Sequence, residues 1–275
     1  MPTNKPANLA RLIDGFELLL ISLIILFLEL ACIRWFPAHV LYLTFFTNVV
    51  LLASFLGMSV GCLTAGRPRN YLTLTPLIIL IALGAAQAVE ISSSSLMRFV
   101  NVGNQVSPQQ VYFGTEYSSQ DLSRYAIPVE VLCGFFFIII ALAFLGPGQE
   151  LGRALNRWPN RLQAYTLNIA GSILGIALFA VCSLLELSPL WWFLLVACGL
   201  SYLFFFSPRT CLQKGLVWRS LTVVLLVSIV SLSAFNFEAQ RRGETSQFWS
   251  PYYRIDFDES NLSMSVNLIY HQHMV

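Results

Sequence analysis

The chain has 275 residues, of which 56% are hydrophobic and only 11% are charged. A water-soluble domain carries roughly 25% charged residues, so this composition excludes an ordinary soluble protein and indicates that lipid surrounds most of the chain. The formal net charge of +2 is too small to indicate a nucleic-acid partner, and the six cysteines contain no C-x-x-C pair that would indicate a zinc or redox site.

Seven apolar segments approach the length of about 20 residues that a helix needs to cross a bilayer. They are residues 16–33, 41–65, 72–91, 127–145, 164–185, 189–206 and 217–235. The sixth segment has only 18 residues, so it is the first candidate for a segment that does not cross the membrane. Between the fourth and fifth, Arg153, Arg157 and Arg161 recur every four residues. That spacing favours a helix lying at the headgroup boundary, with an ordinary basic loop as the alternative.

The positions of Lys and Arg predict the orientation in the membrane. With seven spans and the N-terminus inside, ten of these residues fall on the inner side and six on the outer side. The N-terminus is therefore expected in the cytoplasm, and an odd number of spans places the C-terminal tail on the opposite side.

The tail changes character after Phe235. Residues 237–248 are polar and resemble a linker, and two alternating β-rich runs then flank a polar turn within 249–275, which predicts a β-hairpin. The predicted fold is an all-α polytopic membrane bundle of about seven transmembrane helices, over residues 1–236, with a short C-terminal β-hairpin. Because a lone hairpin is marginal in water, we expect a further part to pack on it, and Val275 to be the end of a truncated or split chain.

Glu29 lies well inside the first apolar segment, where an ionisable group costs roughly 2.5–3.5 kcal/mol on insertion scales and indicates a function. The alternative is structural pairing with Arg34. The predicted topology brings four acids toward one membrane face, namely Glu29, Glu90, Glu130 and Glu186. Such a group could bind a cation such as a polyamine, although the ends of spans also tolerate charge. The candidate intramembrane polar site comprises Glu29, Arg34, Glu130, Asn48 and Asn168, of which the two asparagines are expected to join helices by hydrogen bonds.

Two pairs of glycines spaced four residues apart predict close helix packing. They are Gly57 with Gly61, and Gly171 with Gly175. Packing within the chain is the first interpretation and dimerisation the second. His271 and His273 share one face of the predicted hairpin, but no third ligand accompanies them, so no metal site is expected.

Several stretches resemble the membrane portion of the membrane-bound spermidine synthase-like proteins of bacteria. They are residues 29–38 (ELACIRWFPA), 46–61 (FTNVVLLASFLGMSVG), 165–176 (YTLNIAGSILGI), 249–255 (WSPYYRI) and 266–272 (VNLIYHQ). The resemblance implies a multi-pass protein of the bacterial inner membrane. It also implies that the membrane domain precedes an aminopropyltransferase-like part, in which a small β-hairpin region leads into an α/β fold that binds an S-adenosylmethionine-derived donor.

The tail resembles only the opening hairpin of that part. Soluble relatives have Tyr-Gln where this chain has Tyr252-Tyr253, and Leu-Asp-Gly where it has Val266-Asn267-Leu268. No glycine-rich turn with a following acidic residue comes after the hairpin, and no acidic pair is present there to deprotonate an amine. No catalytic residue and no cofactor are therefore assigned to this chain, and it is not expected to be an enzyme alone.

The expected function is a membrane domain that anchors or assembles with a polyamine-type aminopropyltransferase, as a partner of a catalytic subunit or as a homo-oligomer. A small-cation or polyamine transporter and an inactive fragment are the alternatives. One conflict stays open, because a synthase that uses cytoplasmic metabolites needs its tail inside, whereas the charge distribution places the tail outside.

Overall fold

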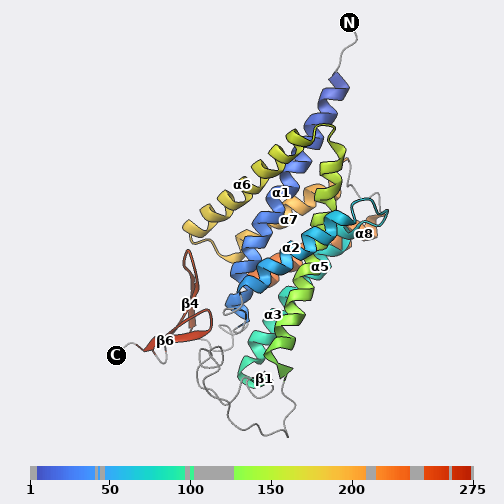
Figure 1. Ribbon diagram of the computed structural model, residues 1–275. Coiled ribbons are helices and arrows are strands. Elements are labelled where there is room, and N and C mark those ends of the chain that lie inside the picture. The colour runs from blue at the N-terminus through green and yellow to red at the C-terminus, as the bar shows by residue number, and fades with distance from the viewer. Residues whose placement is uncertain are drawn as a thin grey trace.

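The computed structural model describes residues 5–40, 43, 47–96, 100–101, 127–208, 215–235, 245–259 and 262–273. Within them, seven α-helices form a bundle, and a small sheet lies beside one end of it (Figure 1). The helices are α1 (Lys5–His39), α2 (Thr47–Leu63), α3 (Thr75–Leu96), α5 (Val129–Arg157), α6 (Arg161–Leu184), α7 (Pro189–Phe205) and α8 (Leu216–Ala234), and the short 3-10 helix η2 (Tyr71–Leu74) leads into α3.

In the described part of the chain, five helices are long and apolar enough to cross a membrane: Ala10–His39, Tyr71–Ile91, Val131–Arg157, Arg161–Leu184 and Leu216–Ala234. Of the roughly seven spans expected, five therefore have the length and composition of a membrane-crossing helix. The other two, α2 and α7, have 17 residues each. At 1.5 Å per residue they reach about 25 Å, which is less than the roughly 30 Å of a hydrocarbon core.

The basic segment expected to lie separately at the headgroup boundary is instead the end of α5. This helix continues through Pro147 to Arg157, and α6 begins at Arg161 after a short turn. Asn160 caps α6, because its side-chain oxygen accepts a hydrogen bond of 3.0 Å from the N–H of Leu162. The helix expected around these arginines is therefore present, but as the end of α5 and the start of α6 and not as a separate element.

The helices pack as parallel pairs, with glycines at two of the contacts. A Cβ on Gly57 would overlap the backbone carbonyl of Ala141, and one on Gly61 would overlap that of Leu145. From the first contact to the second, the residue number rises by four on both helices, so α2 and α5 run in the same direction. Gly171 and Gly175 lie in the same way against Leu19 and Leu23 of α1, which makes α1 and α6 the second parallel pair.

A third parallel pair joins α3 to α8. Gly84 faces Leu232, and the side-chain amide of Gln87 donates to the carbonyl of Phe235 at 2.9 Å. Consecutive helices therefore alternate in direction along the chain. The N-terminal end of α1 and the sheet consequently lie at opposite ends of the bundle, as Figure 1 shows.

The sheet is a four-stranded antiparallel meander in the order β3-β4-β5-β6. Its strands are β3 (Thr245–Trp249), β4 (Arg254–Asp258), β5 (Ser263–Val266) and β6 (Ile269–His273). The structure therefore has a four-stranded sheet where a two-stranded hairpin was expected. The first residues of β3 come from the range assigned to a linker. A separate two-residue bridge pairs β1 (Val100–Asn101) with β2 (Ile127–Pro128) in parallel.

A tight turn divides the second predicted β run into two strands. Asn267 and Leu268 both have positive φ, at 47° and 66°, and Val266 pairs with Ile269 across them. Two central residues with positive φ make a type I′ hairpin turn, which normally carries glycine at the second position. The turn escaped prediction because Leu268 stands where such a glycine would have marked it.

Candidate functional site

The candidate site is the bundle–sheet junction, defined as Arg34, His39, Glu90, Trp192, Trp249 and Arg254. It joins the C-terminal ends of α1 and α3 and the start of α7 to strands β3 and β4. All but Arg34 are at least nine-tenths buried. The sheet is thus attached through side chains that lie inside the protein.

A buried ion pair forms the centre of the junction. Arg254 Nη1 lies 2.7 Å from Glu90 Oε1, and the two side chains are only 2% and 1% exposed. The same Nη1 donates to the carbonyl of Ala38 at 3.0 Å, and Nε donates to Asp256 Oδ1 at 2.9 Å. Desolvating such a pair is costly unless its hydrogen bonds are well made, and here the guanidinium has partners on α1, α3 and its own strand.

Arg254 keeps its charge in this buried position. Burial by itself lowers the pKa of the guanidinium, but the carboxylates of Glu90 and Asp256 outweigh that effect and hold its pKa above the usual value. The guanidinium is therefore charged at any pH near neutrality.

The backbone of the sheet positions Arg254. Its N–H donates to Asn267 Oδ1 at 3.0 Å, and the N–H of Asn267 donates to the carbonyl of Arg254 at 2.9 Å. The β5–β6 turn is thereby fixed to the first residue of β4. Since Asn267 tolerates positive φ and also has a side-chain acceptor, one residue makes both the turn and this bond.

Arg34 forms the second link between bundle and sheet. Its guanidinium carbon lies 4.6 Å from the ring centroid of Trp192 and 5.7 Å from that of Trp249. It donates to Ser183 Oγ at 2.6 Å and to the carbonyl of Ser250. Cation–π contacts of this kind contribute about 0.5–2 kcal/mol. One arginine of α1 therefore contacts α6, α7 and the end of β3.

His39 lies between the two links. Its ring stacks on Trp35 with centroids 3.9 Å apart and faces Trp249 at 6.3 Å. Nδ1 is 2.8 Å from the carbonyl of Trp35, so Nδ1 carries the hydrogen, and Nε2 faces Glu90 Oε2 at 3.8 Å. The imidazole fills the space between the tryptophans and the ion pair.

Glu29 does not pair with Arg34, which corrects the structural interpretation of both residues. Ser54 Oγ is 2.8 Å from Glu29 Oε1, and Glu29 is buried between α1 and α2. Five residues along a helix correspond to a rotation of about 140° beyond a full turn, so the two side chains leave α1 on different faces. Arg34 therefore points to the sheet while Glu29 points to α2.

The described acids do not form a shared cation site. Glu90 is paired with Arg254, and Glu186 is exposed in the turn between α6 and α7. The side chain of Glu130 lies outside the described residues, as do those of His271 and His273. Over the residues that the structure describes, no group of three or more His, Cys, Asp or Glu could hold a metal ion.

The two asparagines differ in their surroundings. Asn168 Oδ1 accepts a hydrogen bond of 2.8 Å from Ser22 Oγ, which joins α6 to α1. Asn48 is exposed in the first turn of α2. Asn168 thus lies in a helix contact of the expected kind, whereas Asn48 faces outward.

A second polar cluster, at the N-terminal end of the bundle, was missed by sequence reasoning. Arg157 Nη2 lies 3.2 Å from Glu17 Oε2 and Nη1 lies 3.1 Å from Glu150 Oε1, and both carboxylates are buried. The Ser207 hydroxyl donates to Glu17. The only signal in the sequence was Glu17 inside an apolar segment, and it did not identify the partner 140 residues away.

Neighbouring residues of α5 hold the turn between α2 and η2. Gln149 Nε2 donates to the carbonyls of Thr64 and Arg69 at 3.1 and 2.9 Å, and Arg153 donates to that of Arg67 at 2.8 Å. Gln149 also accepts a hydrogen bond of 2.8 Å from the N–H of Tyr71. These side chains satisfy backbone groups that a helix end leaves without partners.

Comparisons of the chain with known protein families, with curated proteins and with solved structures find no match. The chemistry of the junction therefore has to be inferred from its geometry. Its charged groups are bonded to neighbouring elements, which suits a rigid mechanical connection.

Proposed function

We propose that this protein is the membrane domain of a spermidine synthase-like protein of the bacterial inner membrane. It holds the β3–β6 sheet against one end of the helical bundle, where an aminopropyltransferase-like catalytic part assembles. The observation that carries the anchoring role is the buried pair between Arg254 and Glu90, at 2.7 Å. The synthase itself is proposed from the sequence resemblance, which includes both the bundle and the start of the sheet.

The geometry favours anchoring over transport of a cation or polyamine. A carrier needs acidic groups that are free to exchange partners with the cargo. Glu90 is held by an arginine, and Glu29 by a serine hydroxyl at 2.8 Å. By contrast, three elements of the bundle, α1, α3 and α7, meet the sheet through Arg34, Glu90 and Trp192, as a permanent attachment requires.

We further propose that α2 and α7 also cross the membrane, which gives seven spans. The alternating helix directions support this, because each short helix connects two longer ones that run the opposite way. Bilayer thinning accommodates a helix a few ångströms too short at modest cost. The N-terminus is then cytoplasmic, since several exposed arginines lie at that end: Arg11, Arg67, Arg69, Arg161 and Arg219.

Purification of the chain with its native partners, in mild detergent from its own membrane, tests the synthase proposal. The complex is assayed for transfer of an aminopropyl group from the S-adenosylmethionine-derived donor to a diamine. Activity is expected with the wild-type chain and is expected to be lost on Arg254→Met, because the sheet is released from the bundle. Arg69→Met, an exposed arginine at the opposite end, is the matched control and should retain activity.

Absence of aminopropyl transfer from the wild-type complex would overturn the synthase proposal. Equal activity of wild type and Arg254→Met would instead overturn the role of the ion pair. A reporter fused after residue 275 decides on which face the catalytic part works, and a cytoplasmic signal together with a cytoplasmic N-terminus would exclude seven spans.

A further inference from the structure

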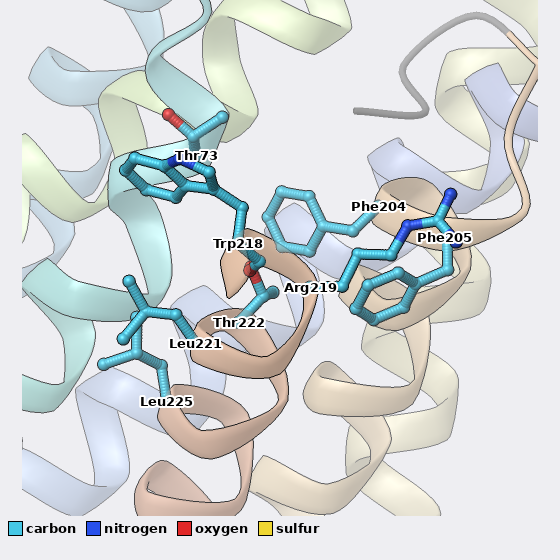
Figure 2. Close-up of a pocket in the computed structure, with 8 residues that line it drawn as sticks. All are labelled: Thr73, Phe204, Phe205, Trp218, Arg219, Leu221, Thr222 and Leu225. Carbon is cyan, nitrogen blue, oxygen red and sulfur yellow. The ribbon is translucent and has the colours of Figure 1, made fainter. Parts of the chain in front are cut away.

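An open cleft lies between α7, α8 and η2, at the end of the bundle opposite the sheet. It is a surface groove in which about 400 Å³ is free of protein atoms, and part of this space is open to solvent. Figure 2 shows the Phe204 ring at its centre, with Leu221 and Leu225 from α8 on one side. Trp218 and Thr73 close the same side toward η2. The cleft is thus mainly apolar and aromatic, with a polar rim.

One positive charge stands at the rim. Arg219 is exposed and, among the described residues, is the one charged residue in the lining of the cleft. Figure 2 shows this side chain extending along Phe205 to the edge of the cleft. An exposed cation beside aromatic rings is accessible to an external anion.

The start of α8 adds a second, independent feature. The helix begins after Gly215, which has no side chain and so supplies no side-chain acceptor to the first N–H groups. The N-terminus of this 19-residue helix also carries the positive end of the helix dipole. Arg219 lies in the first turn of α8, and both features attract an anion to the same place.

The position in the chain indicates the kind of anion. α8 is one of the helices long and apolar enough to cross a membrane. Arg219 is its fourth residue, so in the proposed seven-span arrangement it lies near the headgroups. Basic pockets between transmembrane helices are sites at which anionic lipid headgroups bind.

We propose that this cleft binds an anionic phospholipid. The phosphate lies at Arg219 and the first turn of α8, and one acyl chain lies along Phe204, Leu221 and Leu225. A zwitterionic lipid has the same phosphate and chains, but its ammonium group is repelled by Arg219, the arginine that lines the cleft. The inference rests on the membrane location in the proposed function and is independent of the synthase assignment.

Native mass spectrometry of the purified chain in detergent tests this, with phosphatidylglycerol, phosphatidylcholine or inorganic phosphate added in separate experiments. The wild-type chain should retain phosphatidylglycerol about tenfold more strongly than phosphatidylcholine, because only phosphatidylcholine carries an ammonium group that Arg219 repels. Arg219→Gln should abolish most of this preference. Arg69→Gln removes an exposed arginine outside the cleft and should leave it unchanged.

Three results would overturn the proposal. The first is equal retention of the two lipids by the wild-type chain, and the second is an equal loss of preference in Arg219→Gln and Arg69→Gln. The third is retention of inorganic phosphate alone as strongly as the lipid, which would make the site one for a free anion. Thermal unfolding of both variants in the same detergent checks that the fold is intact. Lipid preference without aminopropyl transfer would support this site while overturning only the synthase proposal.

Discussion

Single residues carry the attachments of this protein, and Glu29 shows how a buried acid is accommodated. Ser54 Oγ lies 2.8 Å from both Glu29 Oε1 and the carbonyl of Leu51. A serine hydroxyl has one hydrogen, so Ser54 donates to one of these two oxygens at a time. Glu29 is thus held by a neutral hydroxyl and not by a counterion.

Glu29→Gln is therefore expected to change the free energy of unfolding by less than about 0.5 kcal/mol, because the amide oxygen can accept the same hydrogen bond from Ser54. Ser54→Ala leaves the buried carboxyl without this partner and should cost about 1–3 kcal/mol. Denaturant unfolding of the detergent-solubilised variants measures both. A large loss of stability in Glu29→Gln would show that an ionised carboxylate, and hence a charged partner, is required there.

At the scale of helices and strands, the local sequence pattern predicts where an element begins and ends better than it predicts which other elements it contacts. The apolar segments 164–185 and 217–235 correspond closely to α6 and α8. The continuation of α5 to Arg157 was not predictable, because Pro147 normally ends a helix. Packing against α2 favours the continuous helix. A Cβ on Gly148 would lie 2.7 Å from Met58 Cα, so the absence of a side chain there lets α2 pack closely against α5 just after Pro147.

The glycine contacts can be tested by a matched pair of substitutions. Gly57→Ala places a methyl group against the backbone of Ala141 and should destabilise the protein by about 1–3 kcal/mol through separation of α2 and α5. Gly134→Ala, within α5, meets nothing within 4 Å and should stabilise by roughly 0.5–1 kcal/mol through reduced chain entropy. Thermal unfolding in detergent compares the two. Equal effects would mean that Gly57 is not a packing position.

The β5–β6 turn offers a further test at this scale. Leu268 has a φ of 66°, a conformation that costs a residue with a Cβ about 1–2 kcal/mol. Leu268→Gly should therefore be more stable than Leu268→Ala by about 1 kcal/mol, because the alanine variant loses the same side chain but keeps the strain. Hydrogen exchange of β5 reports the difference. If the two variants exchange alike, the turn is not strained at this residue.

At the scale of the whole molecule, the sheet and the bundle form one unit through contacts that no local pattern contains. Arg34 and Ser250 are 216 positions apart, as are Arg254 and Ala38. The sequence placed an arginine and a glutamate near the ends of spans but gave no sign that their partners lie in the tail. Composition and periodicity thus predicted the bundle, whereas the junction became visible only in three dimensions.

The junction makes a prediction about how the molecule unfolds. A four-stranded sheet of this size buries little apolar surface by itself, so its stability depends on docking. Arg254→Met leaves Glu90 buried without its guanidinium partner, which should cost about 3–5 kcal/mol. We expect amide exchange in β4 and β5 to accelerate by two orders of magnitude or more, while exchange in α1 and α6 stays slow.

Phe248→Ala is the control for this experiment, because that side chain belongs to the adjacent β3 but is 60% exposed. It should leave exchange in β4 close to that of the wild-type chain. Acceleration in α1 together with β4 would mean that Arg254 supports the bundle itself and not only the attachment. Unchanged exchange in β4 would mean that the tryptophans around Arg34 hold the sheet without the ion pair, and the anchoring role would then belong to Trp192 and Trp249.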